Sequence, residues 1–230
     1  LSPVVLAHVA GRPVEHAGVR KAEVWAVGSL LQVVKRNFSE AQDHRPVIWG
    51  AGLLHPVQGT GFVDHVDIAL VRGPITAALL GLELSEFGDP GLLINAVWPQ
   101  DRAPNGKIGI VPHHSLMDDV MLTALLDNDP KYQLIDPRDP ARDVCAAIAM
   151  CDHVFASSLH GLIVADAYGV PNTWVAPVGQ SRLKYLDYAA SVGRFMPAPV
   201  MIEDIPELHL PDPVSPLLYQ AGIDACRTAL

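Results

Sequence analysis

Residues 151–171, which read CDHVFASSLHGLIVADAYGVP, decide the fold of this chain. A short apolar run predicts a buried strand, the polar elbow SSLHG follows it, and an apolar helix continues until Gly169 closes it. Where a parallel strand meets a helix N-terminus, backbone N–H groups and the helix dipole favour an anion. The elbow therefore predicts a site for a small molecule that bears a phosphate or a carboxylate.

His160 lies in this elbow, where an imidazole can move a proton beside bound negative charge. The alternative is a histidine at a helix start that touches nothing reactive. Ser157 and Ser158 are interpreted as plain helix caps or as anion ligands, and both roles use the same turn. Together with Gly161 they form the candidate anion site.

Working outward, strand-like runs alternate with helical runs along most of the chain. The predicted strands are 23–27, 47–50, 67–71, 107–111, 132–135, 153–156 and 173–175, and the predicted helices are 29–35, 75–80, 118–126, 141–150, 159–168 and 183–191. Several strands are nearly continuous Val, Ile and Ala runs, which is typical of a parallel sheet buried on both faces. The pattern predicts an α/β protein with right-handed crossovers.

A segment rich in proline and turn-forming residues, 98–106, separates two such series. We therefore predict two Rossmann-like lobes with parallel sheets, at 1–100 and 107–200. A proline-rich tail at 201–230 follows, with a last helix near 215–229. Two lobes of this kind bind ligands at the carboxyl ends of their strands.

Composition excludes several classes of function. Half of the residues are apolar and 18% are charged, which is typical of a globular protein. The formal net charge of −9 argues against a nucleic-acid-binding protein, and no apolar run approaches the length of a membrane span. The three cysteines show no metal-ligand spacing, and their odd number favours a reducing, cytoplasmic location. The chain starts with Leu, and we expect it to begin inside a longer reading frame.

Arg72 ends a predicted strand just before a helix that starts at Pro74. A guanidinium there is placed for bidentate contact with phosphate or carboxylate. A surface ion pair with Glu83 or Glu86 is the alternative. Arg182 and Lys184 lie beyond the last strand, where they either close over a ligand or remain solvated.

His113 and His114 follow the first strand of the second series. Adjacent residues of a strand point to opposite sides, so we expect only one of them to face a ligand. A metal site is the weaker interpretation, because further ligands are missing.

Glycine-rich turns follow the early strands. Gly28 and Ser29 come after one strand, and Gly50 and Gly52 come after the next, where they would let the backbone approach a ligand closely. Asp89 lies in a turn before Pro90, where an aspartate side chain commonly stabilises the turn. It is also a candidate for the ligand-binding region. The sequence has no GxSxG elbow and no P-loop, and no Ser-His-Asp triad can be assigned, which argues against common hydrolases and NTPases.

Taken in order, these segments resemble the polysaccharide pyruvyl transferases, which add pyruvate ketals to bacterial surface sugars. The resemblance is carried by AVGSLL at 26–31, VIWGAG at 47–52, VRGP at 71–74, FGDP at 87–90, IGIVPH at 108–113 and SSLHG at 157–161. Many members carry an arginine where this chain has Ser158. The resemblance therefore implies that Arg72 or Arg182 binds the negative charge of the donor substrate in its place. Members typically open with an Asn-x-Gly-Asp segment, and this chain begins where that segment would end.

The resemblance implies a GT-B-like enzyme without a cofactor, with phosphoenolpyruvate as donor and a saccharide or lipid-linked oligosaccharide as acceptor. The first lobe would hold the acceptor and the second the donor. His160 would be the general acid and His113 a base on the acceptor hydroxyl. Arg72, Ser157, Ser158, Gly161, Arg182 and Lys184 would bind the donor. The resemblance also implies a cytoplasmic location, either free or at the inner face of the membrane. A homo-oligomer is left open.

Two alternatives stay open. A glycosyltransferase of the same form would use a nucleotide-sugar and would need a carboxylate for the ribose, for which Asp166 is the candidate. The second alternative is an inactive binding protein of the same fold, which is open because Ser158 stands where the family usually has an arginine.

Overall fold

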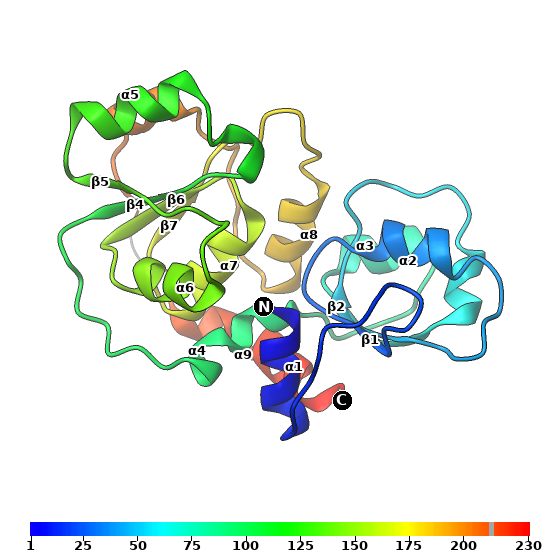
Figure 1. Ribbon diagram of the computed structural model, residues 1–230. Coiled ribbons are helices and arrows are strands. Elements are labelled where there is room, and N and C mark those ends of the chain that lie inside the picture. Colours follow the sequence, from blue (N-terminus) through cyan, green and yellow to red (C-terminus); the bar gives the residue numbers. More distant parts are fainter. Residues whose placement is uncertain (212–213) are drawn as a thin grey trace. The chain divides into compact units, whose positions relative to one another are not determined.

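The computed structural model describes residues 1–211 and 214–230, and Figure 1 labels its helices and strands. The described chain divides into two compact units. Unit 1 comprises Leu1–Leu93, Ser181–Phe195 and Leu218–Leu230, and unit 2 comprises Ile94–Gln180 and Met196–Leu217. Each unit contains one parallel sheet. The predicted α/β class with parallel sheets is therefore confirmed.

Unit 1 is built on a sheet of order β1-β2-β3, formed by β1 (Val24–Trp25), β2 (Val47–Ala51) and β3 (Asp67–Val71). Its helices are α1 (Ser2–Ala10), α2 (Leu31–Asn37), α3 (Pro74–Leu80), α8 (Leu183–Ser191) and α9 (Gln220–Thr228). Leu31, Val34, Ile48, Val71 and Ala77 belong to one buried apolar cluster. The sheet thus shares one core with α2 and α3.

Unit 2 is built on a sheet of order β5-β4-β6-β7, formed by β4 (Ile108–Val111), β5 (Tyr132–Leu134), β6 (His153–Ala156) and β7 (Asn172–Trp174). Its helices are α4 (Ile94–Val97), α5 (Val120–Asn128), α6 (Ala141–Ala149) and α7 (Leu159–Ala167). Figure 1 shows α5 on one face of this sheet and α6 with α7 on the other. All residues of β6 are buried, as expected for a parallel strand covered on both faces.

Short 3-10 helices join these elements at Gly61–His65, Pro90–Leu93, His114–Leu116, Ile202–Glu207 and Pro216–Tyr219. The last of them runs directly into α9, so the single helix predicted at 215–229 is two consecutive helical segments. Residues 212 and 213 of the predicted tail lie outside the described residues.

The unit boundaries differ from the predicted lobes in three respects. Residues 94–100, predicted to belong to the first lobe, lie in unit 2, and residues 218–230, predicted as part of the tail, lie in unit 1. Residues 181–195, predicted to belong to the second lobe, pack in unit 1. Leu183 contacts the apolar cluster of unit 1, and Asp187 binds Arg72 there. Two helices from late in the sequence, α8 and α9, therefore complete the unit that contains the chain's first residues.

Helix α1 was not among the predicted helices. Pro3 lies in its first turn and Gly11 ends it in the left-handed conformation, at φ 61°. Between them the residues are apolar on nearly every side, so the periodicity that identifies an amphipathic helix is absent.

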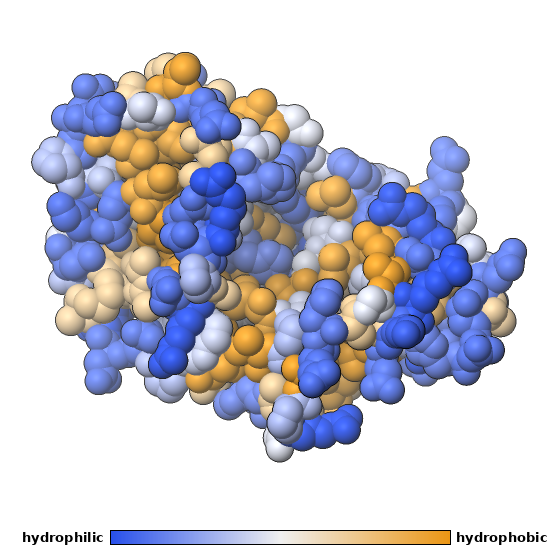
Figure 2. Space-filling model, in the orientation of Figure 1, coloured by the Kyte–Doolittle hydropathy of each residue, from blue (hydrophilic) through white to orange (hydrophobic). Residues whose placement is uncertain are grey.

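The face of the molecule in Figure 2 carries mainly hydrophilic residues, with apolar atoms showing over α5. In that helix the side chains of Val120 and Met121 are exposed. Of the helices in the described part of the chain, none has both the length and the apolar character that a membrane span requires.

Candidate active site

The strand order of unit 2 selects one edge of its sheet as a ligand site. The chain runs from β4 to β5 and then to β6, yet β4 lies between β5 and β6. The connection that leaves β4 runs to β5 on one side, and the connection that leaves its neighbour β6 runs to β7 on the other side. In open α/β sheets, ligands bind at the carboxyl ends of the strands where the order reverses in this way. Here that position is formed by the ends of β4 and β6.

Hydrogen bonds join the segments that follow these two strands. The Ser157 hydroxyl accepts from the backbone N–H of His113 at 2.8 Å. The backbone N–H groups of Ser157 and Ser158 donate to the carbonyl of Val111, at 3.2 and 3.4 Å. Ser157 is only 2% exposed. Its hydroxyl therefore holds the loop after β4 against the elbow after β6.

Helix α7 starts at this elbow. Ser158 occupies the N-cap position, but its side chain makes no capping hydrogen bond, so its interpretation as a side-chain cap is wrong. The first N–H groups of a helix have no intrahelical acceptor, so this end of α7 offers donors to an anion. His160 lies in the first turn and is partly buried. A proton-transfer group and an anion-binding helix end thus lie within one turn.

Gly161 allows α7 to begin close to the sheet. A Cβ at this position would lie 2.9 Å from Cγ1 of Val111 and 3.0 Å from Cβ of Ala156. Side chains do not pack that closely, so a larger residue would push the helix start away from the ends of β4 and β6. This packing accounts for the glycine in the SSLHG elbow.

His113 and His114 do not point to opposite sides as expected. β4 ends at Val111, and after Pro112 the chain enters the 3-10 helix His114–Leu116 instead of continuing as a strand. The alternation of a strand no longer applies there, and the two imidazole rings lie 4.0 Å apart between centroids, tilted by 43°. His113 precedes that short helix, and its ring accepts a hydrogen bond from the backbone N–H of Ser115.

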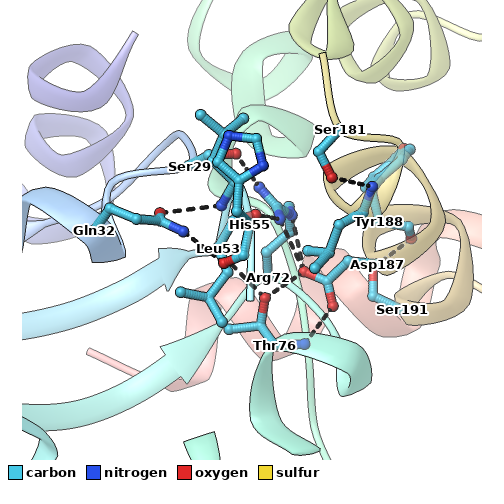
Figure 3. A network of polar contacts seen from close by, with 12 residues as sticks. Ser29, Gln32, Leu53, His55, Arg72, Thr76, Ser181, Asp187, Tyr188 and Ser191 are labelled. Carbon is cyan, nitrogen blue, oxygen red and sulfur yellow. Dashed lines mark hydrogen bonds and ion pairs between the residues drawn. The ribbon is translucent and has the colours of Figure 1, made fainter. Parts of the chain in front are cut away.

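In unit 1, Arg72 is fully buried, and Figure 3 shows the polar network around it. Its Nε donates to Asp187 at 3.0 Å, one terminal nitrogen donates to Ser29 Oγ at 2.8 Å, and the other to the Leu53 carbonyl at 2.8 Å. Asp187 also accepts from Thr76, from the backbone N–H at 2.8 Å and from the hydroxyl at 2.7 Å. The alternative of a surface ion pair with Glu83 or Glu86 is wrong, because Arg72 is paired with a buried carboxylate of α8.

The glycine-rich turns of unit 1 are packed against the chain itself. A Cβ at Gly50 would collide with Pro90, and one at Gly52 would collide with the Arg72 guanidinium. Gly28 has a positive φ of 126° just before Ser29. These close approaches to other parts of the same unit explain why Gly50 and Gly52 cannot be larger.

Asp89 is fully buried, and its Oδ1 accepts from the backbone N–H of Gly91 at 2.9 Å. It closes a turn by bonding two residues ahead, the structural role that its position before proline suggested.

Arg182 and Lys184 lie at the start of α8, in unit 1. Arg182 is exposed and precedes the first residue of the helix. Lys184 is 8% exposed, and its Nζ lies 5.0 Å from the centroid of the Tyr185 ring. Burial, and then the positive charge of Arg72, lower the pKa of Lys184 to about 8.

The structure thus brings His113, Ser157, Ser158, His160 and Gly161 together at one edge of unit 2, and Ser29, Gly52 and Arg72 together in unit 1. Sequence reasoning missed Ser115, Thr76 and Asp187, and also Gln180, whose amide nitrogen lies 2.7 Å from the ring nitrogens of His113. Ser115 follows His113 by two residues, a spacing at which a side chain often bonds the backbone ahead of it. Asp187 lies 115 residues from Arg72, and no local pattern pairs them.

A pocket of about 580 Å³ lies elsewhere in unit 1, between α1, the loop after it and β1. Ser2, Leu6, Val14, Val19 and Trp25 are among the residues that line it, and none of the predicted site residues does. Within residues 1–211 and 214–230, no three His, Cys, Asp or Glu side chains gather closely enough to hold a metal ion.

Comparison with known proteins relates the central part of the chain to one family. Residues 36–177 match the family model described as polysaccharide pyruvyl transferase. The succinoglycan biosynthesis protein ExoV of Rhizobium meliloti (strain 1021) is 35% identical over 132 residues, which cover 55% of this chain and 41% of ExoV. The uncharacterized protein L143 of Acanthamoeba polyphaga mimivirus is 28% identical over 171 residues, which cover 68% of this chain and 58% of L143.

The chain therefore spans about half the length of the curated relatives that it matches. No solved structure matches it significantly.

Proposed function

The chain belongs to the polysaccharide pyruvyl transferase family, and we propose that it moves pyruvate from phosphoenolpyruvate onto two hydroxyls of a sugar as a ketal. The proposed acceptor is a saccharide or lipid-linked oligosaccharide of a bacterial exopolysaccharide or cell-surface glycan. The naming of ExoV as a succinoglycan biosynthesis protein supports a polysaccharide product. A GT-B-like form with two Rossmann-like lobes is part of the proposal, supported by the two parallel sheets.

The elbow of unit 2 is the observation that carries the proposal. It combines the N-terminus of a nine-residue helix, an imidazole in its first turn and a second imidazole tied to the same elbow through Ser157. Phosphoenolpyruvate has two anionic groups that a helix N-terminus can bind and a methylene carbon that must receive a proton. An anion site with an adjacent proton donor suits this substrate.

In the proposed reaction, the imidazolium of His160 transfers a proton to the methylene carbon of phosphoenolpyruvate, which becomes a methyl group. The adjacent carbon gains oxocarbenium character, and one acceptor hydroxyl attacks it and releases its proton. The bond between this carbon and the phosphate oxygen then breaks, and phosphate leaves with the bonding electron pair. The second hydroxyl attacks the same carbon and releases its proton, which closes the ketal ring.

The protons of this sequence balance. Two hydroxyl protons are released, of which one restores the His160 imidazolium and the other leaves with phosphate or solvent. N–H groups at the start of α7 would stabilise the negative charge of the donor and of departing phosphate. The contribution of Arg182 and Lys184 to donor binding remains a prediction. Arg72 is less suited to it, because Asp187 already neutralises its guanidinium.

The environment of Asp166 weighs against a nucleotide-sugar as donor. Its side chain is 4% exposed, and its Oδ1 accepts from Nδ2 of the buried Asn172 at 2.7 Å. A carboxylate that binds ribose hydroxyls must be able to reach a ligand, and Asp166 lies inside unit 2 instead.

The direct test is pyruvate transfer by the parent protein and by His160→Gln, measured as phosphate release from phosphoenolpyruvate and as ketal formation. We expect a loss of at least about 100-fold in His160→Gln, in the range of a general acid. His209→Gln is the matched control, because His209 is exposed in the same unit. Transfer by His160→Gln at the rate of the control would refute the acid role.

A thermal-shift titration with phosphoenolpyruvate and with UDP-sugars separates the donor classes, since a ligand that binds the native state stabilises it. Stabilisation by phosphoenolpyruvate alone agrees with the proposal. Selective stabilisation by a UDP-sugar would point to glycosyl transfer, and phosphoenolpyruvate binding without transfer would point to an inactive binding protein.

A further inference from the structure

The ring of His113 is held through one of its two nitrogens. Its Nδ1 accepts a hydrogen bond from the backbone N–H of Ser115 at 3.3 Å, and the Ser115 hydroxyl lies 2.9 Å from the same atom. A backbone N–H can only donate. The Nδ1 atom that faces it must therefore present a lone pair.

This contact determines where the proton of the ring lies. A neutral imidazole carries one proton, and its two nitrogens are then one donor and one acceptor. With the lone pair on Nδ1, the proton is on Nε2.

We infer that His113 acts as a hydrogen-bond donor through Nε2–H to an anionic oxygen of the donor substrate, with Ser115 as the positioning residue that fixes this tautomer. The inference rests on the proposed function for the identity of the substrate. It gives His113 a different role from the base expected from the sequence, because a nitrogen that carries a proton cannot remove one from an acceptor hydroxyl.

The surroundings of the ring agree with a fixed orientation. The backbone N–H of His113 donates to the Ser157 hydroxyl, which ties the residue to the elbow where the anion is expected. The amide nitrogen of Gln180 lies 2.7 Å from both ring nitrogens, and the ring of His114 covers one side. With Nε2 protonated, Gln180 must present its oxygen to the ring, because an amide nitrogen at this position would face a donor. That oxygen accepts from Nε2–H in the absence of substrate, and an anionic oxygen of the donor substrate would replace it.

The tautomer can be observed without any activity. The protein labelled with ¹⁵N-histidine gives distinct nitrogen chemical shifts for protonated and unprotonated ring nitrogens, and the resonances missing from His113→Gln assign those of His113. We expect an unprotonated Nδ1 and a protonated Nε2 at neutral pH. Ser115→Ala should keep this pattern, because the backbone N–H remains. A protonated Nδ1 in the parent protein would overturn the inference.

The role is tested by a matched pair of substitutions. His113→Gln places an amide N–H near the position of Nε2, whereas His113→Glu supplies a base and no donor. A donor role predicts that Gln lowers phosphoenolpyruvate affinity about tenfold or less, and that Glu lowers it at least another tenfold through repulsion of the anion. If His113 were a base, His113→Glu would transfer pyruvate faster than His113→Gln. That order of rates would overturn the inference.

These experiments keep the two proposals apart. If the parent protein neither binds phosphoenolpyruvate nor transfers pyruvate, the proposed function fails, whatever the ring tautomer. If it does both while Nδ1 carries the proton, the inference about His113 fails and the proposed function stands.

Discussion

Replacing Asp187 by Asn is expected to destabilise unit 1 by about 3–5 kcal/mol, the cost of leaving one member of a buried ion pair without its partner. Arg72 and Asp187 both have fully buried side chains, and their closest charged atoms are 3.0 Å apart. Asparagine has nearly the shape of aspartate and carries no charge. The substitution therefore tests the charge and leaves the volume unchanged.

The geometry of the carboxylate places the expected cost at the upper end of this range. Oδ2 of Asp187 accepts from Arg72 and from the Thr76 hydroxyl, while Oδ1 accepts from the backbone N–H of Thr76. Asparagine replaces one oxygen by an NH₂ group, so in either orientation a donor faces a donor. One buried polar contact is lost in addition to the counter-ion.

The same unit offers a control pair that differs in burial. Arg45 and Asp67 are 2.8 Å apart, with side chains 51% and 57% exposed. Exposed pairs contribute at most about 1 kcal/mol, so Asp67→Asn should change the free energy of unfolding by less than that.

Unfolding in urea, followed by tryptophan fluorescence, measures both variants. A chain with two units need not unfold in a single step, so the signal must come from unit 1 alone. Trp25 and Trp49 belong to unit 1, whereas Trp98 and Trp174 belong to unit 2. Replacing Trp98 and Trp174 by Phe in every variant leaves a probe of unit 1.

If Asp187→Asn lowers the free energy of unfolding by no more than Asp67→Asn does, the buried ion pair does not contribute as expected and the prediction is refuted. If Asp187→Asn does not fold, the double variant Arg72→Met with Asp187→Leu decides the matter. Removing both charges is often neutral or stabilising, so this variant should fold and be more stable than Asp187→Asn. A double variant that is equally unfolded would show that packing around α8, and not the stranded charge, is responsible.

Three further predictions follow from single positions. Gly161→Ala should cost about 1–3 kcal/mol in the free energy of unfolding, measured in urea, and should weaken phosphoenolpyruvate binding, because its Cβ would press α7 away from the sheet. Lys184→Met should be more stable than the parent by up to about 3 kcal/mol at neutral pH, since the lowered pKa of about 8 means that folding disfavours the charged amine. The unfolded chain keeps that proton up to its usual pKa of 10.5, so the parent gains stability between pH 8 and 10.5 and the gap should close there in pH-dependent urea melts. Arg182→Gln should raise the KM for phosphoenolpyruvate if this exposed residue contacts the donor, and an unchanged KM would remove it from the site.

Much of the local structure could be predicted from the sequence, because its signals are local. Strands 67–71 and 153–156 and the helix 183–191 have the predicted bounds, and the other predicted strands differ by a few residues. The elbow at 157–161 was also predictable, since a strand, a polar turn and an apolar helix follow one another directly. Helix α1 was missed because nearly all of its residues are apolar, which leaves no periodic contrast.

The contacts that define the candidate site were harder to predict from the sequence. The bond between Ser157 and the backbone of His113 depends on β4 and β6 being neighbours, which is a property of the sheet order. The paired orientation of His113 and His114 depends on where β4 ends, and strand ends are poorly encoded in composition.

The segment VRGP at 71–74 shows that a motif carrying a family resemblance can also be explained by packing within the chain. Its arginine was expected to reach a ligand, yet in the structure the segment receives α8. Arg72 and Thr76 bind the Asp187 carboxylate, and a Cβ at Gly73 would collide with the backbone carbonyl of that same residue. The arginine, the glycine and the threonine are therefore all explained by one helix that returns to unit 1 from late in the chain. A charged residue at the end of a strand predicts a ligand only when no carboxylate of the chain itself is brought to it.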